Sequence, residues 1–350
     1  MNLFVQSWSD GKKLPKSYIF PPEKRPGENG IAPKTNQSVP LIDLTNAFGD
    51  AHHPARADVI HQLIKASQEL GAFQIKNHGV PSKLLNEARS VIKEFFELPG
   101  EYKEKYISYD SKDIFTLYTS NYNYFAEDLH FWRDGITQRC LPVEKCAPYW
   151  PDKPANYREV IGEFTTKVNE VGKELLKLIA EGLGLEADYF EKAKVGDVVD
   201  MNVNHYPSCP DPKLTLAAGR HRDRSLITIV MQGDIAGLQF VKDGEWIPAD
   251  PIPDVFVVNL GNVMQVVSNG KLKPGEHQVV TNENVARESA AVFLCPADDQ
   301  LFGPAKELTD DENPPIYRDL HYHELLAAHN RGRTFKLSSD QTLKTFLLKA

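Results

Sequence analysis

Between residues 198 and 295 the chain carries a series of short apolar runs separated by turn signals, and this pattern restricts the fold more than any other feature. The runs are rich in β-branched residues, and the dipeptides Asp243-Gly244 and Asn269-Gly270 between them are typical of tight turns. No helical spacing interrupts the series, so we expect an antiparallel sandwich or barrel. The expected strands are 199–206, 226–231, 237–241, 246–248, 255–260, 265–267, 277–280 and 290–294.

The N-terminal half has helical spacing instead. Apolar residues recur every three or four positions within 55–70, 84–98 and 155–183, which predicts three amphipathic helices. The stretch VPLIDL at 39–44 predicts a short buried strand, whereas 106–134, crowded with Tyr, Asn, Asp and Phe, predicts a functional loop. These patterns divide the chain into an extended N-terminal arm (1–37), a helix-rich N-terminal domain (38–150), a long linking helix region (151–197), the β core (198–300) and a helical tail (301–350).

Composition narrows the class of protein. The 350 residues are 41% hydrophobic and 25% charged, which suits a globular chain with a large core. The formal charge of -8 lacks the basic excess of nucleic-acid or anionic-membrane binders. The four cysteines form no CxxC pair and predict free thiols in a reducing compartment. Because the sequence shows no signal-type apolar region and no long apolar span, we expect a cytoplasmic monomer that binds neither nucleic acid nor a membrane.

Two potential metal ligands stand directly before the apolar run 226–231. His221 and Asp223 are two residues apart, so on a strand edge they point to the same face. His277 opens another apolar run farther along the chain. Taken singly, each of these is more often a polar strand-edge residue than a ligand. Together, two imidazoles and one carboxylate match the facial triad of non-haem Fe(II) oxygenases, which leaves about three octahedral positions free.

A second cluster of polar residues suits the recognition of a carboxylate. Arg287 and Ser289 again have same-face spacing, and a guanidinium beside a hydroxyl can bind a carboxylate through charged, bidentate hydrogen bonds. Asn204 and Tyr206 end an alternating strand, and the Tyr206 hydroxyl is a candidate for a further hydrogen bond to the same group. His205, which alternates with them, is expected to face the opposite side.

These motifs occur in an order that resembles a known family. HxD at 221–223, His277, RxS at 287–289 and NxYP at 204–207 are similar to those of the plant soluble iron(II)/2-oxoglutarate-dependent dioxygenases. VPLIDL and ELGAFQIKNHGVP resemble the N-terminal domain of that family, so the resemblance covers roughly residues 38 to 325. FVQSW near the start and FWRD at 131–134 are most similar to the hyoscyamine 6-hydroxylase-like branch, which acts on specialised metabolites.

The resemblance implies a fold and a set of cofactors. The expected fold is α+β, with a double-stranded β-helix (jelly-roll) core and a helix-rich N-terminal domain packed around it. His221, Asp223 and His277 would bind Fe(II). Arg287, Ser289, Tyr206 and Asn204 would bind the co-substrate 2-oxoglutarate. Dioxygen would be the second co-substrate, and ascorbate would act as the reductant.

The expected reaction is hydroxylation of an unactivated C–H bond in a small, largely apolar metabolite, with alkaloids as one candidate class. Desaturation, epoxidation and O- or N-demethylation use the same oxidant and stay open as alternatives. So does a 2-oxoglutarate-independent oxidase of the same fold. A non-catalytic binding protein is a further alternative, although it predicts a defective triad. Halogenation is disfavoured, because halogenating relatives lack the carboxylate that Asp223 supplies here.

The substrate-binding residues are predicted with less support from motifs. Aromatic residues of the 106–134 segment and the tail are the candidates, and they are Tyr118, Tyr122, Tyr124, Phe131 and Tyr322. An amine-bearing substrate would favour a nearby carboxylate such as Glu127, Asp128 or Glu324. Arg222 and Arg224 around Asp223, and PGEH before the second histidine, depart from the family pattern and affect the charge and shape of the site entrance.

Overall fold

The computed structural model describes residues 4–9, 13–26, 37–48, 53–108, 110, 113–121, 124–125, 127–334 and 339–348. Most strands of this part of the chain belong to two sheets. The larger sheet has the order β1-β2-β10-β7-β12-β5-β4-β3, with β1 and β2 parallel and every other neighbouring pair antiparallel. Its strands are β1 (Leu41–Asp43), β2 (Ala72–Lys76), β3 (Phe115–Thr119), β4 (Asp134–Arg139), β5 (Val198–Tyr206), β7 (Ile227–Met231), β10 (Phe256–Leu260) and β12 (Arg287–Cys295).

The second sheet is antiparallel and has the order β6-β11-β8-β9. Its strands are β6 (Ala218–His221), β8 (Leu238–Lys242), β9 (Glu245–Pro248) and β11 (His277–Val279). One apolar cluster joins the two sheets, with Val230 and Val257 from the larger sheet packed among Leu238, Phe240 and Val279 from the smaller one. The two sheets therefore close on each other as a jelly roll. A short pair, β13 (Leu301–Phe302) and β14 (Leu320–His321), lies outside it.

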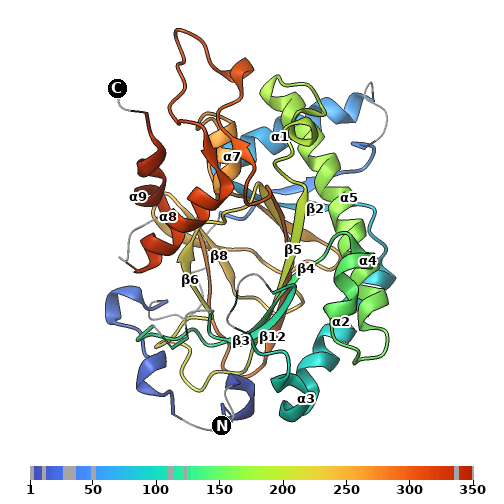
Figure 1. The fold of residues 1–350 in the computed structure, drawn as a ribbon, viewed down its shortest axis with the longest axis vertical. Coiled ribbons are helices and arrows are strands. Elements are labelled where there is room, and N and C mark those ends of the chain that lie inside the picture. Colours follow the sequence, from blue (N-terminus) through green and yellow to red (C-terminus); the bar gives the residue numbers. More distant parts are fainter. Residues whose placement is uncertain are drawn as a thin grey trace.

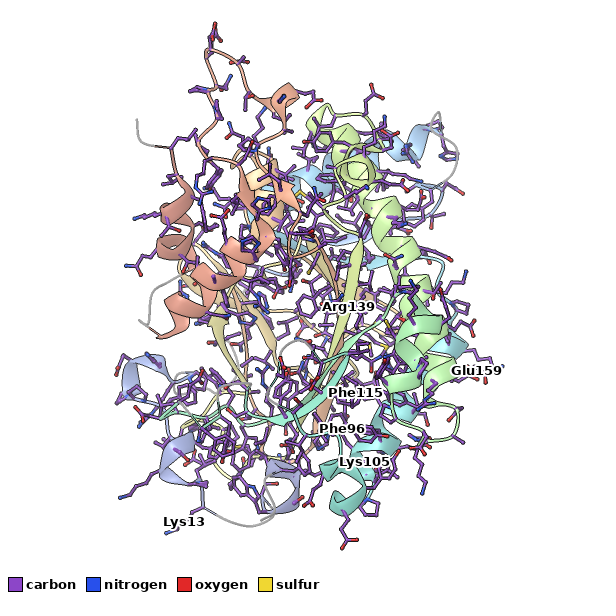
Figure 2. All side chains as sticks on the ribbon, in the orientation of Figure 1. Lys13, Phe96, Lys105, Phe115, Arg139 and Glu159 are labelled. Carbon is purple, nitrogen blue, oxygen red and sulfur yellow. The ribbon has the colours of Figure 1, made fainter. Side chains whose placement is uncertain are left out.

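Helices cover the outer face of the larger sheet (Figure 1). The longest, α5 (Tyr157–Leu183), buries an apolar stripe and contacts both α1 (Pro54–Glu69) and α2 (Ser82–Glu97). Gly172 of α5 lies so close to the sheet that a Cβ there would stand 2.7 Å from the Leu294 side chain of β12. Figure 2 shows the side chains filling this layer, with Phe96 and Phe115 inside and Glu159 at the outer edge. The remaining helices are α3 (Gly100–Glu104), α4 (Val143–Cys146), α6 (Tyr189–Lys192), α7 (Asn262–Val267), α8 (Tyr322–Thr334) and α9 (Ser339–Leu343).

The described parts of the N-terminal arm contain three short 3-10 helices. They are η1 (Val5–Ser7), η2 (Lys16–Tyr18) and η3 (Pro22–Lys24); three others, η4 (Ala147–Tyr149), η5 (Lys306–Leu308) and η6 (Lys344–Phe346), occur later. Backbone N–H groups of Val5 and Gln6 donate to the two oxygens of the buried Asp134 carboxylate, each at 2.9 Å. Trp8, Tyr18 and Trp132 pack edge to face beside this contact. The arm is therefore anchored to the first residue of β4.

The predicted α+β jelly roll is confirmed, and two local predictions are wrong. Gln265–Val267 was expected as a strand, but it forms the end of α7, which interrupts the β series. The 106–134 segment was expected as a loop, but it contains β3, whose five residues are all buried. Among the described residues, no helix is long and apolar enough to cross a membrane.

Candidate metal centre

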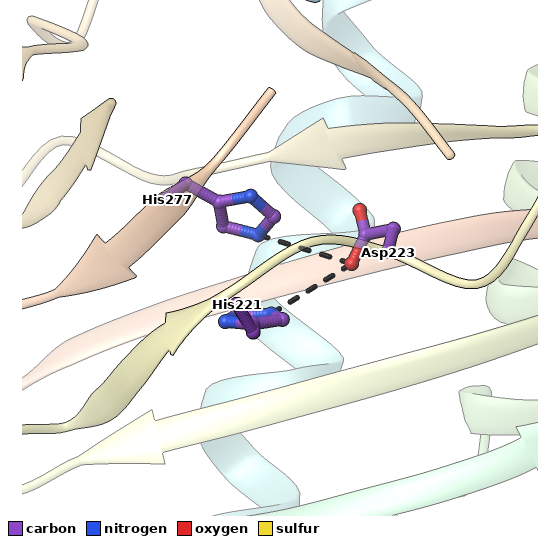
Figure 3. A group of neighbouring side chains, drawn as sticks. All are labelled: His221, Asp223 and His277. Atoms are coloured by element: carbon purple, nitrogen blue, oxygen red, sulfur yellow. Dashed lines mark ion pairs between the residues drawn. The ribbon is translucent and has the colours of Figure 1, made fainter. Parts of the chain in front are cut away.

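His221, Asp223 and His277 converge on one point. His221 ends β6 and His277 begins β11, and the two residues are direct partners in the antiparallel register. Their Nε2 atoms lie 3.7 Å and 3.8 Å from the same oxygen, Oδ1 of Asp223 (Figure 3). One ligand atom from each residue lies within 4.8 Å of the others. Strand pairing thus brings His277 next to His221 and Asp223, which lie much earlier in the sequence.

The backbone fixes which nitrogen of each imidazole faces the centre. His221 Nδ1 donates to the Gly219 carbonyl at 2.7 Å, and His277 Nδ1 donates to the Gly275 carbonyl at 3.0 Å. A neutral imidazole that donates through Nδ1 carries its free electron pair on Nε2. Both rings therefore present a ligand-competent Nε2 toward Asp223, which is the arrangement that second-shell hydrogen bonds give metal-binding histidines.

Buried polar groups hold the Asp223 carboxylate. Asn259 Nδ2 of β10 donates to Oδ2 at 3.2 Å, while Oδ1 faces the imidazoles. Burial would raise the pKa of Asp223, but the adjacent His277 and His221 and hydrogen bonds from Thr228 and Asn259 outweigh it, so the pKa is lowered. Asp223 is consequently held as a carboxylate, the form that binds a metal ion.

The electrostatics of the imidazoles also favour metal binding. Desolvation and the neighbouring His277 ring lower the pKa of His221, which keeps that imidazole neutral. The side chains of Asp223 and His277 are each only 6% exposed, whereas that of His221 is 39% exposed, so the centre opens on the His221 side. Two imidazole nitrogens, one carboxylate oxygen and one open side fit a non-haem Fe(II) ion with free coordination positions.

A buried guanidinium faces the interior from the same jelly roll. Arg287 begins β12 and is 3% exposed; its Nε donates to the Ile235 carbonyl at 3.0 Å. Its Nη1 is buried and has no hydrogen-bond partner among the described residues. A Cβ on Gly237 would lie 3.2 Å from Arg287 Cδ, so this glycine leaves room for the arginine side chain. Because an unpaired buried charge is costly, the orphaned Nη1 fits an anionic ligand such as a carboxylate.

The other predicted 2-oxoglutarate residues lie beside Arg287. Tyr206 is its direct partner in the β12–β5 register, and the guanidinium carbon lies 5.2 Å from the Tyr206 ring centre. Ser289 pairs with Asn204 two residues farther along the same strands. His205 turns to the opposite face, as expected, where it stacks on Phe96 with ring centres 5.0 Å apart.

The structure places the predicted substrate-binding residues in different environments. Phe131 lies against β6, since a Cβ on Gly219 would stand 2.9 Å from its ring. Tyr118 of β3 is buried, and its ring lies over Gly135 of β4. Tyr124 instead stacks on His130 at 4.1 Å between ring centres. Tyr322 is buried in the main core, and Tyr122 lies outside the described residues.

Three residues near the centre were missed by the sequence reasoning. Asn259 orients Asp223, and Arg133 hydrogen-bonds Asn204. Glu276, in the unusual PGEH approach, pairs with Arg220 through both carboxylate oxygens and links β11 to β6 beside the two histidines. Although desolvation opposes it, pairing with Arg220 and Arg222 lowers the pKa of Glu276. The sequence marks Glu276 through the PGEH departure and Arg133 through the FWRD motif, but it gives no signal for Asn259.

A jelly roll that carries two histidines and an aspartate on one side defines the class of non-haem iron oxygenases. Family models agree with this geometry. Residues 199–296 match the 2OG-Fe(II) oxygenase superfamily, and residues 39–158 match the model described as non-haem dioxygenase in morphine synthesis N-terminal. The chain belongs to the plant family of 2-oxoglutarate- and Fe(II)-dependent dioxygenases, and it is an enzyme that uses iron and 2-oxoglutarate.

Relatives match over nearly the whole chain. The 2'-deoxymugineic-acid 2'-dioxygenase of Hordeum vulgare is 39% identical over 335 residues, which cover 95% of this chain and 94% of the relative. Hyoscyamine 6-dioxygenase of Hyoscyamus niger is 38% identical, with 93% of each chain covered. The crystal structure of JOX2 in complex with 2OG, Fe and JA superimposes with a TM-score of 0.83 at 29% identity, covering 99% of this chain and 98% of that one. The hyoscyamine branch is therefore not singled out from the others.

Proposed function

We propose that this enzyme hydroxylates an unactivated C–H bond of a small specialised metabolite and converts 2-oxoglutarate to succinate and CO2 in the same cycle. The observation that carries the proposal is the convergence of His221, Asp223 and His277, within 4.8 Å of one another, in the jelly roll that also holds the orphaned Arg287 guanidinium. Bound iron would supply, with 2-oxoglutarate and dioxygen, an oxidant strong enough to break a C–H bond.

The chain's own residues have separable roles in this proposal. The two imidazoles and Asp223 would hold the iron, and the more exposed surroundings of His221 would admit co-substrate and oxygen. Arg287 and Ser289, with Tyr206 and Asn204 beside them, would bind and orient the carboxylate end of 2-oxoglutarate. Asp223 fills the third protein-ligand position, which supports hydroxylation over halogenation. Asn259 would keep Oδ1 of Asp223 directed at the metal.

The substrate class is inferred from the relatives and from the surroundings of the centre. The printed names of the relatives refer to 2'-deoxymugineic acid and hyoscyamine, and the JOX2 structure contains JA. These are small molecules of different scaffolds. Phe131 and Tyr118 near the β6 and β4 strands suit an apolar portion of such a metabolite.

A metabolite screen tests the proposal. Purified protein is incubated with Fe(II), ascorbate, 2-oxoglutarate and a panel of specialised metabolites, and products are read by mass spectrometry alongside succinate. We expect a product that gains one oxygen atom, with succinate formed in step. Product without 2-oxoglutarate would instead indicate an oxidase of the same fold. Loss of two hydrogens or of a methyl group would indicate desaturation or demethylation.

A further inference from the structure

Arg133 directly precedes β4. Its side chain is held by hydrogen bonds to the end of β3 and to β5. Its Nε donates to the Ser120 carbonyl at 2.7 Å, and its Nη1 donates to Oδ1 of Asn204 at 3.2 Å. The guanidinium carbon also lies 5.9 Å from the Tyr118 ring centre and 5.7 Å from the Phe131 ring centre. Four contacts thus fix the position of one half-buried positive charge.

These contacts place Arg133 beside the reaction centre. Asn204 is on β5 and pairs with Ser289, one of the residues proposed for 2-oxoglutarate. Phe131 packs against Gly219, whose carbonyl orients the His221 ring. Arg133 therefore lies next to Asn204, one of the residues proposed for 2-oxoglutarate, and contacts the aromatic ring that packs on β6.

The charge of Arg133 has no carboxylate partner among the described residues. Arg56, Arg89, Arg139 and Arg318 each pair with an acid, whereas Arg25 and Arg158 donate to backbone carbonyls. The adjacent Asp134 is not available, because both of its oxygens accept from the backbone of the N-terminal arm. Arg133 shares this lack of an acidic partner with Arg287, for which a bound carboxylate is proposed.

We infer that Arg133 is a substrate-recognition residue that binds a carboxylate of the organic substrate, with Tyr118 and Phe131 flanking the apolar part next to that carboxylate. The inference rests on the proposed function and narrows its substrate class from small metabolites to those that bear a carboxylate. Such a contact is charge-assisted, and it would turn the substrate so that a carbon at a fixed distance from the carboxylate faces the metal. An amine as the recognised group would be repelled by Arg133.

Matched pairs of small ligands test the inference by binding rather than by turnover. The probes are phenylacetate, 3-phenylpropanoate and cinnamate, each compared with its primary amide, in anaerobic equilibrium dialysis against protein loaded with Fe(II) and 2-oxoglutarate. We expect the wild-type protein to prefer the carboxylates. Arg133→Gln should weaken carboxylate binding about 10- to 100-fold and leave amide binding unchanged. Arg133→Lys should retain part of the preference for carboxylates, because it keeps the positive charge but loses the planar guanidinium that can donate two hydrogen bonds to a carboxylate.

Controls separate this role from folding and from co-substrate binding. Arg89→Gln removes the same charge from a half-buried, paired arginine and should leave the preference intact. Iron and 2-oxoglutarate uptake are measured for each variant and should be unchanged in Arg133→Gln. A parallel loss of 2-oxoglutarate binding would overturn the inference, because it would assign Arg133 to the co-substrate. If wild-type protein binds iron and 2-oxoglutarate without preferring carboxylates, the inference fails and the proposed function stands; if it binds neither, both fail.

Discussion

The metal centre and the aromatic region beside it are built in different ways. In the metal centre, the register of β6 and β11 places His221 opposite His277, and backbone carbonyls two residues before each histidine orient the rings. In the aromatic region, Phe131, Tyr118 and Arg133 contact one another, and Phe131 and Arg133 also contact β6 and β5, which come much later in the sequence. The comparison indicates that strand pairing positions the proposed metal ligands, whereas side-chain packing positions the residues that we propose to contact the substrate.

The largest effect is expected from removing a side chain of the metal centre. Asp223→Ala should abolish turnover, because the two imidazoles alone leave the iron without its only anionic protein ligand. Oxygen consumption and succinate formation with an active metabolite measure this loss. Asp234→Ala removes an exposed carboxylate that pairs with Arg89 and should retain full activity. Appreciable turnover by Asp223→Ala would show that the reaction does not depend on this metal centre.

The next largest effect is expected at Arg287. Arg287→Leu should weaken 2-oxoglutarate binding by about 2–3 kcal/mol, or roughly 30- to 150-fold, because a charge-assisted contact to its carboxylate is lost. Iron binding should persist, since Arg287 has no hydrogen bond to the triad. Equilibrium dialysis with labelled 2-oxoglutarate measures the change. An unaltered dissociation constant for 2-oxoglutarate would show that Arg287 does not bind this co-substrate.

A smaller effect is expected from the hydrogen bond behind Asp223. Asn259→Ala should lower the affinity for Fe(II) about 10-fold or more, because the carboxylate loses the donor that fixes its free oxygen. Asn202→Ala, which instead removes a hydrogen bond with Thr137 on the larger sheet, serves as the control. Competition with a chelator under argon gives both affinities. Equal values for the two variants would mean that Asn259 does not position the ligand.

The smallest effect on the metal centre is expected from the arm. Asp134→Asn should reduce the free energy of unfolding by about 1–3 kcal/mol, because an amide can no longer accept from both Val5 and Gln6. Urea denaturation measures this change, with the exposed Asp128→Asn as the matched control. Iron affinity should be unchanged. A large loss of iron binding in Asp134→Asn would contradict the separation between the two regions.

The sequence predicted the two regions unequally, for a physical reason. His221, Asp223, His277 and Arg287 sit at strand ends, where spacing and residue type alone indicate both the face and the chemistry. Arg133 and Asn259 act through partners on other strands, and a single sequence does not reveal which residues become neighbours. The sequence marks Arg133 only as part of the FWRD motif and Asn259 only as part of an apolar run.

The errors in the fold have a similar origin. Gln265–Val267 is a short apolar stretch, and stretches of that length do not distinguish a strand from a buried helix. In the structure it extends α7, which begins where the Asn262 N–H donates to the Asp223 carbonyl. The mixed aromatic and polar residues of β3 do not show the pattern of a strand, yet β3 is buried where it pairs with β4 and where Phe115 packs on Phe95 and Tyr106. Both elements depend on long-range contacts, whereas α1, α2 and α5 follow the predicted helical spacing closely.

The most direct test of the account is an anaerobic titration of the purified protein with Fe(II), together with His277→Ala and, as a control, His323→Ala in α8. The account predicts one tightly bound iron per chain in the wild-type protein and in His323→Ala, and no tight site in His277→Ala. Equal iron uptake by His277→Ala, or no uptake by the wild-type protein, would contradict the convergence of the three side chains on one metal ion.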